Sequence, residues 1–456
     1  MSPSADAPGP PDEPSTGNAA TRPFPALIGD IAAKTFPLYL SMVAGVVGTL
    51  VTAAVLGHAG TASLAAYAMT VAVFNPAVMV VQGALRGSMP FVAQSGDDPG
   101  ELESTFRDAM WLALCAGSLG GLAVTAVPAL STLIGVPEAT LAAFGPFPYL
   151  MALTLVVVSF QASATTLLIA LGRSKEALWV GLVGTGSSVV LIPALVLGPG
   201  PLPALGMTGA GVAMFVNATA ALATAHLLLR RRTALNGRRV GLGRPVWSTV
   251  WRMARVGLPM GSTMLIKFGV LGVLAMAAAT AGVADAAAHQ IMITLATFVF
   301  LPATAVGQAT VPFMARADTD RHDYREVRRS LLAGVCLALP VVAAGVLLVF
   351  LVAHPVLGVF TPDPRVQALV IALLPVLFVV VVADGAQALP GMGLLAIKRT
   401  TPTLYTFAVC FGSLALIAFP VAAGGLAWLW TAYAVASLGL VLGQAGSFLR
   451  FTVTRP

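Results

Sequence analysis

The sequence predicts an all-α polytopic membrane protein with twelve transmembrane helices arranged as two six-helix pseudo-repeats, or lobes. Three observations support this: an apolar composition, twelve long apolar runs and an internal repeat. Hydrophobic residues make up 57% of the 456-residue chain and charged residues only 9%, whereas a soluble domain carries roughly 25% charged residues. Because so few charges cannot cover a water-facing surface, most of the chain must face lipid.

The apolar runs divide the chain into twelve expected spans. They cover residues 34–57, 63–86, 109–134, 146–171, 177–198, 207–229, 255–281, 285–312, 330–353, 366–395, 402–421 and 426–449. Each is about 20 residues or more, which is enough to cross roughly 30 Å of hydrocarbon. We therefore expect a disordered cytoplasmic tail at 1–25, an N-lobe at 26–229, a basic cytoplasmic linker at 230–249 and a C-lobe at 250–456. The tail lacks the features of a cleaved signal peptide.

Basic residues gather in alternate connections between the expected spans. If the N-terminus lies in the cytoplasm, the outer connections hold a single basic residue, Arg365. Because cytoplasmic loops are enriched in Lys and Arg, this bias predicts a multi-pass protein of the cell (inner) membrane with both termini cytoplasmic. The basic stretch 230–244 then sets the topology, and no nucleic-acid partner is expected. The excess of Arg over Lys, with abundant Ala, Gly and Val, suggests a bacterial origin.

The second half of the chain repeats the first with an offset of 222 residues. Pro37 matches Pro259, and Pro90-Phe91-Val92-Ala93 matches Pro312-Phe313-Met314-Ala315, although the frame slips by a few residues farther on. Six spans per half is an even number, so both halves would enter the membrane in the same direction, as parallel repeats. Two lobes that rock about a central cavity are a common use of such an architecture.

Several short motifs resemble the multidrug and toxic compound extrusion (MATE) transporters. They are Gly257-Leu258-Pro259, Ala287-Ala288-His289-Gln290-Ile291, Pro90 to Gln94, Gly206-x-x-Gly209-Ala210-Gly211, and Asp384-x-x-Gln387 followed by Gly391. The resemblance covers roughly residues 30–450. It implies a V-shaped, two-lobe antiporter that expels organic compounds with a Na⁺ or H⁺ gradient. It also implies that Asp384 takes the place of the family's C-lobe aspartate.

Charged residues inside the spans are candidates for function, because each costs roughly 2.5–3.5 kcal/mol to insert. Asp384 lies 14 residues before Lys398 and Lys267 lies 12 residues after Arg255, so both sit at similar depth in the C-lobe. We expect them to form a buried ion pair that substrate or proton breaks during transport. The alternative is a permanent pair that only holds two helices together.

The sequence departs from the resemblance at two acidic positions. Lys267 falls where many relatives carry a glutamate, and the first span, 37–57, has no acid where some relatives carry an aspartate. This disfavours a Na⁺ site of family type and favours proton coupling through Asp384, with exchange driven by an anionic substrate as the alternative. We expect no cofactor other than H⁺ or Na⁺ as the coupling ion, and no metal site, because no Cys/His cluster with ligand spacing is present.

Polar residues in the other apolar runs are the candidates for a substrate cavity. A cavity-facing Arg86 could bind a carboxylate or phosphate through two hydrogen bonds, which would make the substrate acidic or zwitterionic. Snorkelling of Arg86 toward the headgroups is the alternative. Asn75, His289, Gln387 and Gln308, the repeat counterpart of Arg86, complete the expected cavity. For Asn75 and His289, hydrogen bonding or packing between helices is the alternative.

These features favour a protein that is not an enzyme. We expect a monomeric secondary active antiporter in the lipid bilayer that exports small organic compounds, such as a drug or secondary metabolite, by alternating access. A flippase for a lipid-linked precursor is the alternative, although this chain offers only Arg86 and Lys267 as cavity cations. A membrane-embedded transferase is disfavoured, because the sequence has no Walker A, HExxH or GxSxG motif.

Overall fold

The computed structural model describes residues 23–58, 61–95, 98–133, 138–198, 204–236, 241–321 and 323–453, and the secondary structure of these residues is helical. The first half contains α1 (Phe24–His58), α2 (Thr61–Arg86), α3 (Met89–Gln94), α4 (Pro99–Thr125), α5 (Val127–Leu133), α6 (Glu138–Phe144), α7 (Phe147–Ala170), α8 (Ser174–Leu197) and α9 (Gly206–Arg232). The second half contains α10 (Trp247–Ala281), α11 (Val283–Arg321), α12 (Tyr324–Leu351), α13 (Ala353–Phe360), α14 (Pro364–Ala396), α15 (Thr401–Ala422) and α16 (Leu426–Val453).

Twelve helical segments of the described chain are long and apolar enough to cross a membrane, as the sequence predicts. Several extend beyond the predicted spans: α1 begins at Phe24, α10 begins at Trp247 and α11 continues to Arg321. Hydropathy detects only the apolar part of a helix, whereas backbone hydrogen bonding continues into its polar ends. Helices therefore extend into the expected tail at 24–25 and into the expected linker at 230–232 and 247–249; residues 1–22 lie outside the described chain.

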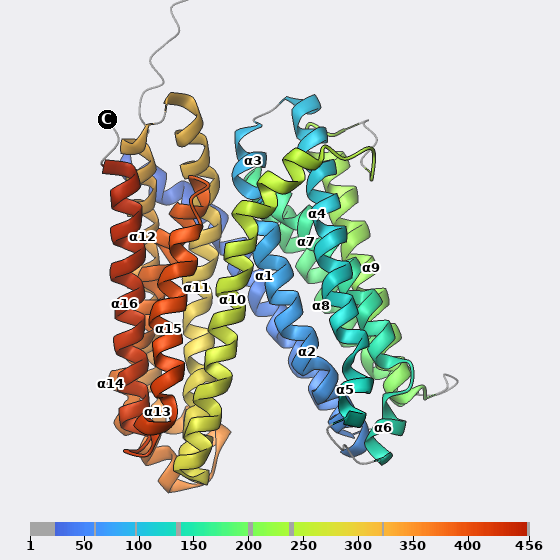
Figure 1. The fold of residues 1–456 in the computed structure, drawn as a ribbon, viewed down its shortest axis with the longest axis vertical. Coiled ribbons are helices and arrows are strands. Elements are labelled where there is room, and N and C mark those ends of the chain that lie inside the picture. Colours follow the sequence, from blue (N-terminus) through green and yellow to red (C-terminus); the bar gives the residue numbers. More distant parts are fainter. Residues whose placement is uncertain are drawn as a thin grey trace, which may run out of the picture.

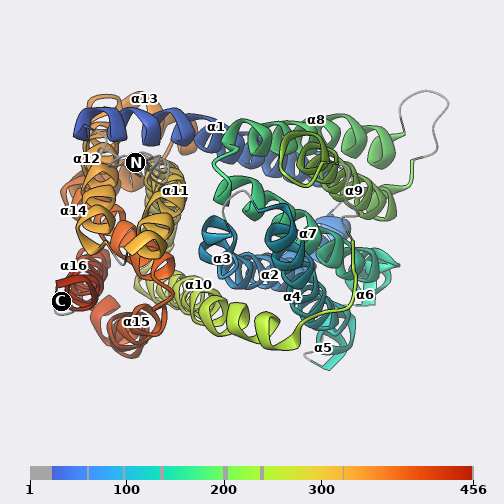
Figure 2. The same cartoon turned by 90° about the horizontal axis from the view of Figure 1, so that it is seen from above.

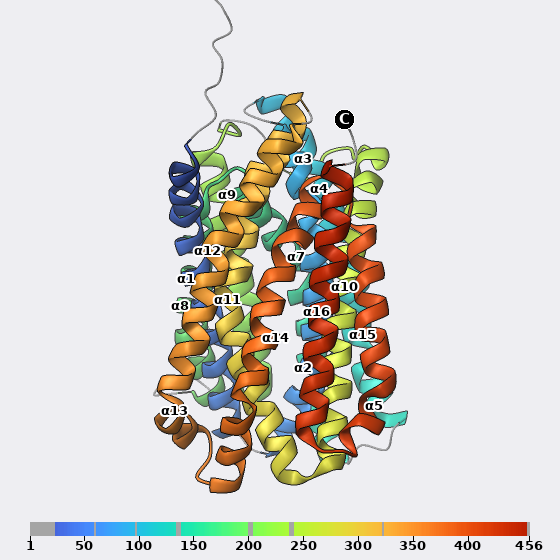
Figure 3. The same ribbon diagram turned by 90° about the vertical axis from the view of Figure 1, so that its left-hand side faces the viewer.

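The helices form two groups that approach each other at the end near the C-terminus and diverge toward the opposite end (Figure 1). The first helix of each half runs across from one group to the other (Figure 2). Helix α1 contacts α11 and α12 as well as α8, and α10 contacts α2 and α4 as well as α15. On the C-lobe side (Figure 3), α14 lies against α11, α12 and α16. The two halves thus share one architecture, and α1 and α10 connect them.

Buried apolar residues join the lobes at one end only of the described structure. One cluster contains Ile31 and Met89 of the first half together with Met314 of the second. A separate cluster, which includes Phe74 and Phe147, contains residues of α1–α9 alone. The lobes therefore share a core where they converge, and we call this the closed end.

Helices α2 and α10 meet at the closed end through glycines. A Cβ atom added to Gly257 would overlap the Ala84 carbonyl oxygen, and one added to Gly83 would lie 2.7 Å from the Gly261 Cα atom. Small residues allow two membrane helices to approach backbone to backbone. Gly257, which belongs to one of the motifs singled out in the sequence, is therefore a packing position between the lobes.

Two lysines and two phenylalanines bridge the lobes at the same end. The Lys34 Nζ atom of α1 lies 4.3 Å from the ring centroid of Phe313 on α11. The Lys398 Nζ atom, which follows α14, lies 4.2 Å from the ring centroid of Phe91 on α3 and also donates a hydrogen bond to the Gln94 side chain. Burial lowers the pKa of the Lys398 ammonium from its ordinary value. Cation–π contacts of this kind contribute about 0.5–2 kcal/mol each.

Candidate substrate and coupling site

A cavity of about 360 Å³ lies between the lobes, with α1 and α2 on one side and α10, α11, α14, α15 and α16 on the other. Most of its surface is apolar, and the apolar lining includes the methionine and phenylalanine side chains Met42, Met79, Met260, Met264, Met392, Phe268, Phe300 and Phe407. Its polar side chains include Gln82, Arg86, Lys267, Asp384, Gln387, Tyr433 and Gln444. This combination suits a compact organic molecule with a polar or charged group.

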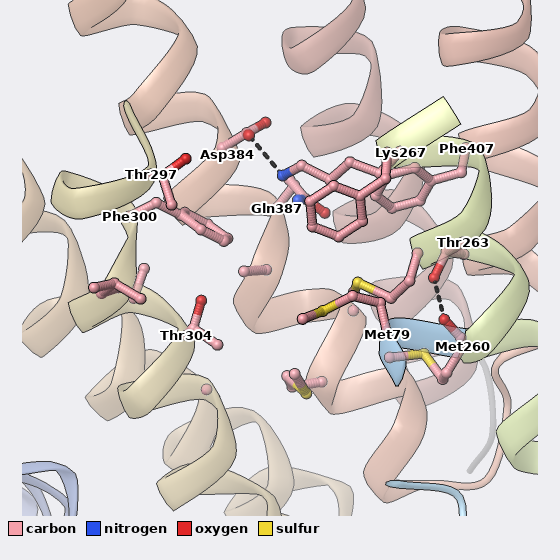
Figure 4. Close-up of a pocket in the computed structure, with 18 of the residues that line it drawn as sticks. Met79, Met260, Thr263, Lys267, Thr297, Phe300, Thr304, Asp384, Gln387 and Phe407 are labelled. Carbon is pink, nitrogen blue, oxygen red and sulfur yellow. Dashed lines mark hydrogen bonds and ion pairs between the residues drawn. The ribbon is translucent and has the colours of Figure 1, made fainter. Parts of the chain in front are cut away.

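The two charged residues predicted to pair are in contact in the cavity wall. Lys267 on α10 donates a hydrogen bond from Nζ to Asp384 Oδ2 on α14, at 2.8 Å (Figure 4). Their side chains are 13% and 8% exposed. The Lys267 Nζ atom also lies 4.6 Å from the ring centroid of Phe300. Desolvated charges of opposite sign neutralise each other, so removing either partner alone would leave a buried charge uncompensated.

Helix α16 completes the polar network around Asp384. The Ser437 hydroxyl donates to Asp384 Oδ1 at 3.1 Å, and Gln444 Nε2 donates to Gln387 Oε1 at 2.8 Å. Tyr433, one helical turn before Ser437, lines the same cavity as Asp384. The sequence reasoning missed these three residues of α16. Their spacing was the available signal, because residues four and seven positions apart share one face of a helix.

Arg86 also lines the cavity, at the last residue of α2. Its side chain is half-buried, and within the described part of the chain its guanidinium takes part in no hydrogen bond or ion pair. Arg86, Lys267 and Asp384 are the charged residues among the lining, so the lining carries one net positive charge.

Three residues expected in the cavity do not line it, which corrects the sequence-based expectation. Asn75 is exposed, lies one turn before Met79 on α2 and is not among the residues that line the cavity. Gln308 is 7% exposed and buried beside the lining residue Gly307. His289 is buried with its ring 5.7 Å from that of Trp430, and neither ring nitrogen has a hydrogen-bond partner among the described residues. Each of these side chains lies on another side of its helix, or at another level along it, than the residues that line the cavity.

Metal-binding groups do not gather in this region. Among the described residues, no three His, Cys, Asp or Glu side chains lie close enough together to hold a metal ion.

The fold and the cavity define a two-lobed, multi-span membrane protein with a charged site between its lobes. The model of the MatE family matches residues 37–194 and 259–445, which together make up more than half of the chain. The chain therefore belongs to the MatE family. The two matched segments fall in the two halves, in agreement with the repeat predicted from the sequence.

Curated relatives match most of the chain. A protein of Aromatoleum aromaticum named "Probable multidrug resistance protein NorM" is 26% identical over 411 residues, which cover 86% of this chain and 87% of that protein. A protein of the same name from Xanthomonas campestris pv. campestris is 29% identical over 355 residues and covers 75% of this chain and 76% of its own.

Solved structures share the fold at lower identity. The crystal structure of "MATE in the straight conformation" aligns with a TM-score of 0.82 at 19% identity, over 94% of this chain and 98% of that one. A MATE family transporter described as in an "outward-facing conformation" aligns with a TM-score of 0.83 at 18% identity, over 95% and 99% of the two chains. A transporter from Pyrococcus furiosus, described as having "reverse polarity of binding pocket", aligns with a TM-score of 0.82 at 17% identity, over 96% and 100%.

Proposed function

We propose that this protein is a multidrug-type exporter, a secondary active antiporter that moves small organic compounds out of the cell by alternating access with H⁺ as the coupling ion. It acts as a monomer in the bacterial inner membrane with both termini in the cytoplasm, and the diverging ends of its lobes face outward. The family and the names of the bacterial relatives support the transport class. The positive-inside pattern of the loops supports the orientation.

The Lys267–Asp384 pair carries the proposal of proton coupling. Helix α10 packs on α2 of the N-lobe near Gly257, and the same helix is tied to α14 of the C-lobe through Lys267. Protonation of Asp384 neutralises the carboxylate and leaves the ammonium without its counter-charge, which favours separation of the pair. Protonation of Asp384 would thereby loosen α10 from α14 and the rest of the C-lobe. The two lobes can then rearrange around the cavity.

Transport in proteoliposomes tests this proposal. The reconstituted protein is given either a pH gradient or a Na⁺ gradient, and efflux of a drug-type substrate is measured for wild type, Asp384→Asn and Lys267→Ala. We expect a pH gradient alone to drive efflux, and both variants to lose coupled efflux while remaining inserted and folded. Efflux driven by Na⁺ alone, or coupled efflux by Asp384→Asn, would show that the pair is only structural.

A flippase for a lipid-linked precursor is the second candidate. The observation in its favour is the pair of cationic side chains, Arg86 and Lys267, in one cavity between the lobes, since a pyrophosphate headgroup carries several negative charges. Pairing of Lys267 with Asp384 removes half of that positive charge, which weakens this assignment. Protein-dependent transbilayer movement of a fluorescent polyprenyl pyrophosphate in liposomes, without any ion gradient, would favour the flippase.

A further inference from the structure

We infer that the Arg86 guanidinium binds an acidic group of the substrate, so that the transported compound is a compact organic acid with an apolar body. This inference rests on the proposed function, because it assigns the substrate class of the same cavity. The argument combines the position of Arg86 in the fold, the charge balance of the cavity and the character of the remaining wall.

A helix break positions Arg86. Helix α2 ends at this residue and α3 begins at Met89, whereas the equivalent helix of the second half, α11, continues unbroken through Gln308. The backbone N–H groups of Gly87 and Ser88 donate to carbonyl oxygens of α2 at 3.1 and 3.0 Å, and the Ser88 hydroxyl donates to the Leu85 carbonyl. The break satisfies its own backbone groups, so the donors of Arg86 are not needed there.

The same break lies against a rigid support. A Cβ atom added to Gly87 would overlap the backbone of Gly257 on α10, so α2 and α10 are in direct backbone contact one residue beyond Arg86. Gly83, on the other side of Arg86, meets the backbone of Gly261 in the same way, so the backbone that carries the guanidinium is held against α10. Preorganised donors lose less entropy when they bind a ligand.

The charge balance of the cavity favours an anion. Asp384 compensates Lys267 at 2.8 Å, and no described residue compensates Arg86. A charge in a largely apolar surrounding is costly unless it is paired. A carboxylate or sulfonate offers two oxygens in the geometry that a guanidinium binds with two parallel hydrogen bonds. A cationic compound would instead meet a lining of net positive charge.

The remaining wall fits an apolar body of modest size. Met79 lies two turns before Arg86 on α2, and Met260 and Phe407 face the same space (Figure 4). Methionine side chains adapt to ligands of different shape. Gln82, one turn before Arg86, adds a neutral polar group beside the guanidinium. A volume of about 360 Å³ admits a ring system of two or three fused rings rather than a long lipid.

A matched set of probes tests the inference. The probes are 2-naphthoate, 2-naphthylmethanol and 2-naphthylmethylammonium, which share a ring and differ in charge. Equilibrium binding of radiolabelled 2-naphthoate to the full chain in nanodiscs is measured, with the other two compounds as competitors. The variants are Arg86→Gln, Arg86→Lys and, as a control outside the cavity, Arg365→Gln.

We expect saturable 2-naphthoate binding to wild type that weakens at least tenfold in Arg86→Gln, falls less in Arg86→Lys and is unchanged in Arg365→Gln. Both competitors should bind at least tenfold more weakly than 2-naphthoate. Stronger competition by the ammonium compound, equal binding by Arg86→Gln, or no saturable binding of 2-naphthoate overturns the inference. The result is independent of coupling: binding that depends on Arg86 can be found even if Asp384→Asn still exports, in which case only the proposed coupling fails.

Discussion

The two lobes share a fold but differ in chemistry. In the C-lobe, Lys267 on α10 pairs with Asp384 on α14. The repeat places Gly45 of α1 and Val158 of α7 at the matching positions of the N-lobe, with the offset of 222 for the first pair and 226 for the second. Neither residue can carry a charge. The comparison indicates that the repeat supplies the architecture of both lobes, and that at these matched positions the titratable pair belongs to the C-lobe.

At the closed end each lobe has a lysine–phenylalanine contact with the other lobe, but the two lysines come from different parts of the chain. Phe91 and Phe313 are repeat partners, and each lies beneath a lysine, Lys398 and Lys34 respectively. The register that matches Gln161 with Gln387 matches Gly172 with Lys398, and both have positive φ, +74° and 57°. A Cβ atom on Gly172 would lie 2.8 Å from the Lys34 Nζ atom. A glycine in one lobe therefore leaves room for a lysine from α1, whereas the other lobe supplies the lysine from the loop itself.

The largest expected effect comes from removing one member of the C-lobe pair. Lys267→Met or Asp384→Leu alone should cost about 3–5 kcal/mol, because each leaves an uncompensated buried charge, whereas the double variant should be near wild type in stability. Thermal unfolding in detergent measures the cycle. Coupled export should be lost in all three variants. Recovery of coupled export in the double variant would make the pair structural and erase this difference between the lobes.

The glycine contact between α2 and α10 should tolerate almost no added volume. We expect Gly257→Ala to cost about 1–3 kcal/mol, because the new methyl group overlaps the Ala84 carbonyl and forces the two helices apart. Gly269→Ala on the same helix is the matched control, since a Cβ atom there meets nothing within 4 Å. Thermal stability of the two variants is compared. Equal stability would mean that the lobes can separate at this crossing without cost.

The glutamines at matching positions of the two lobes should respond unequally. Gln387→Leu leaves the buried Gln444 amide without its partner and should cost about 1–3 kcal/mol. Gln161 bonds only to Thr165 on its own helix among the described residues, so Gln161→Leu should stay within about 0.5 kcal/mol of wild type. Denaturation midpoints measure both. A cost for Gln161→Leu as large as that for Gln387→Leu would reveal a polar function in the N-lobe as well.

The smallest expected effect concerns the two lysines at the closed end. Lys34→Met and Lys398→Met each remove one cation–π contact, which contributes about 0.5–2 kcal/mol to closure, and Lys398→Met also removes the hydrogen bond to Gln94. A cysteine at the buried position Met89, in a background without the native cysteines, reports opening through its rate of maleimide labelling. The rate should rise roughly two- to thirtyfold in either variant and stay unchanged in Lys175→Met, which removes an exposed lysine. A rise in only one variant would show that the two contacts are not equivalent.

Composition and spacing alone determine the membrane class, the twelve spans and the common depth of Lys267 and Asp384. These properties follow from the transfer free energy summed along a helix and from the constant rise per residue. Both can be calculated without knowing which other helices a helix contacts. The structure has the contact that this depth predicts. The sequence also indicates the repeat, because matching prolines and phenylalanines recur in one register.

Only the tertiary structure decides which residues face the cavity. A helix that is apolar on every side has no hydrophobic face to set its rotation, so the sequence left His289 and Gln308 as cavity candidates although both are buried elsewhere. For the same reason the sequence did not identify Ser437 and Gln444 of α16 as residues of the site. They complete the hydrogen-bond network around Asp384 and Gln387. Rotation about the helix axis is set by packing against neighbouring helices, and that information lies in contacts between residues far apart in the chain.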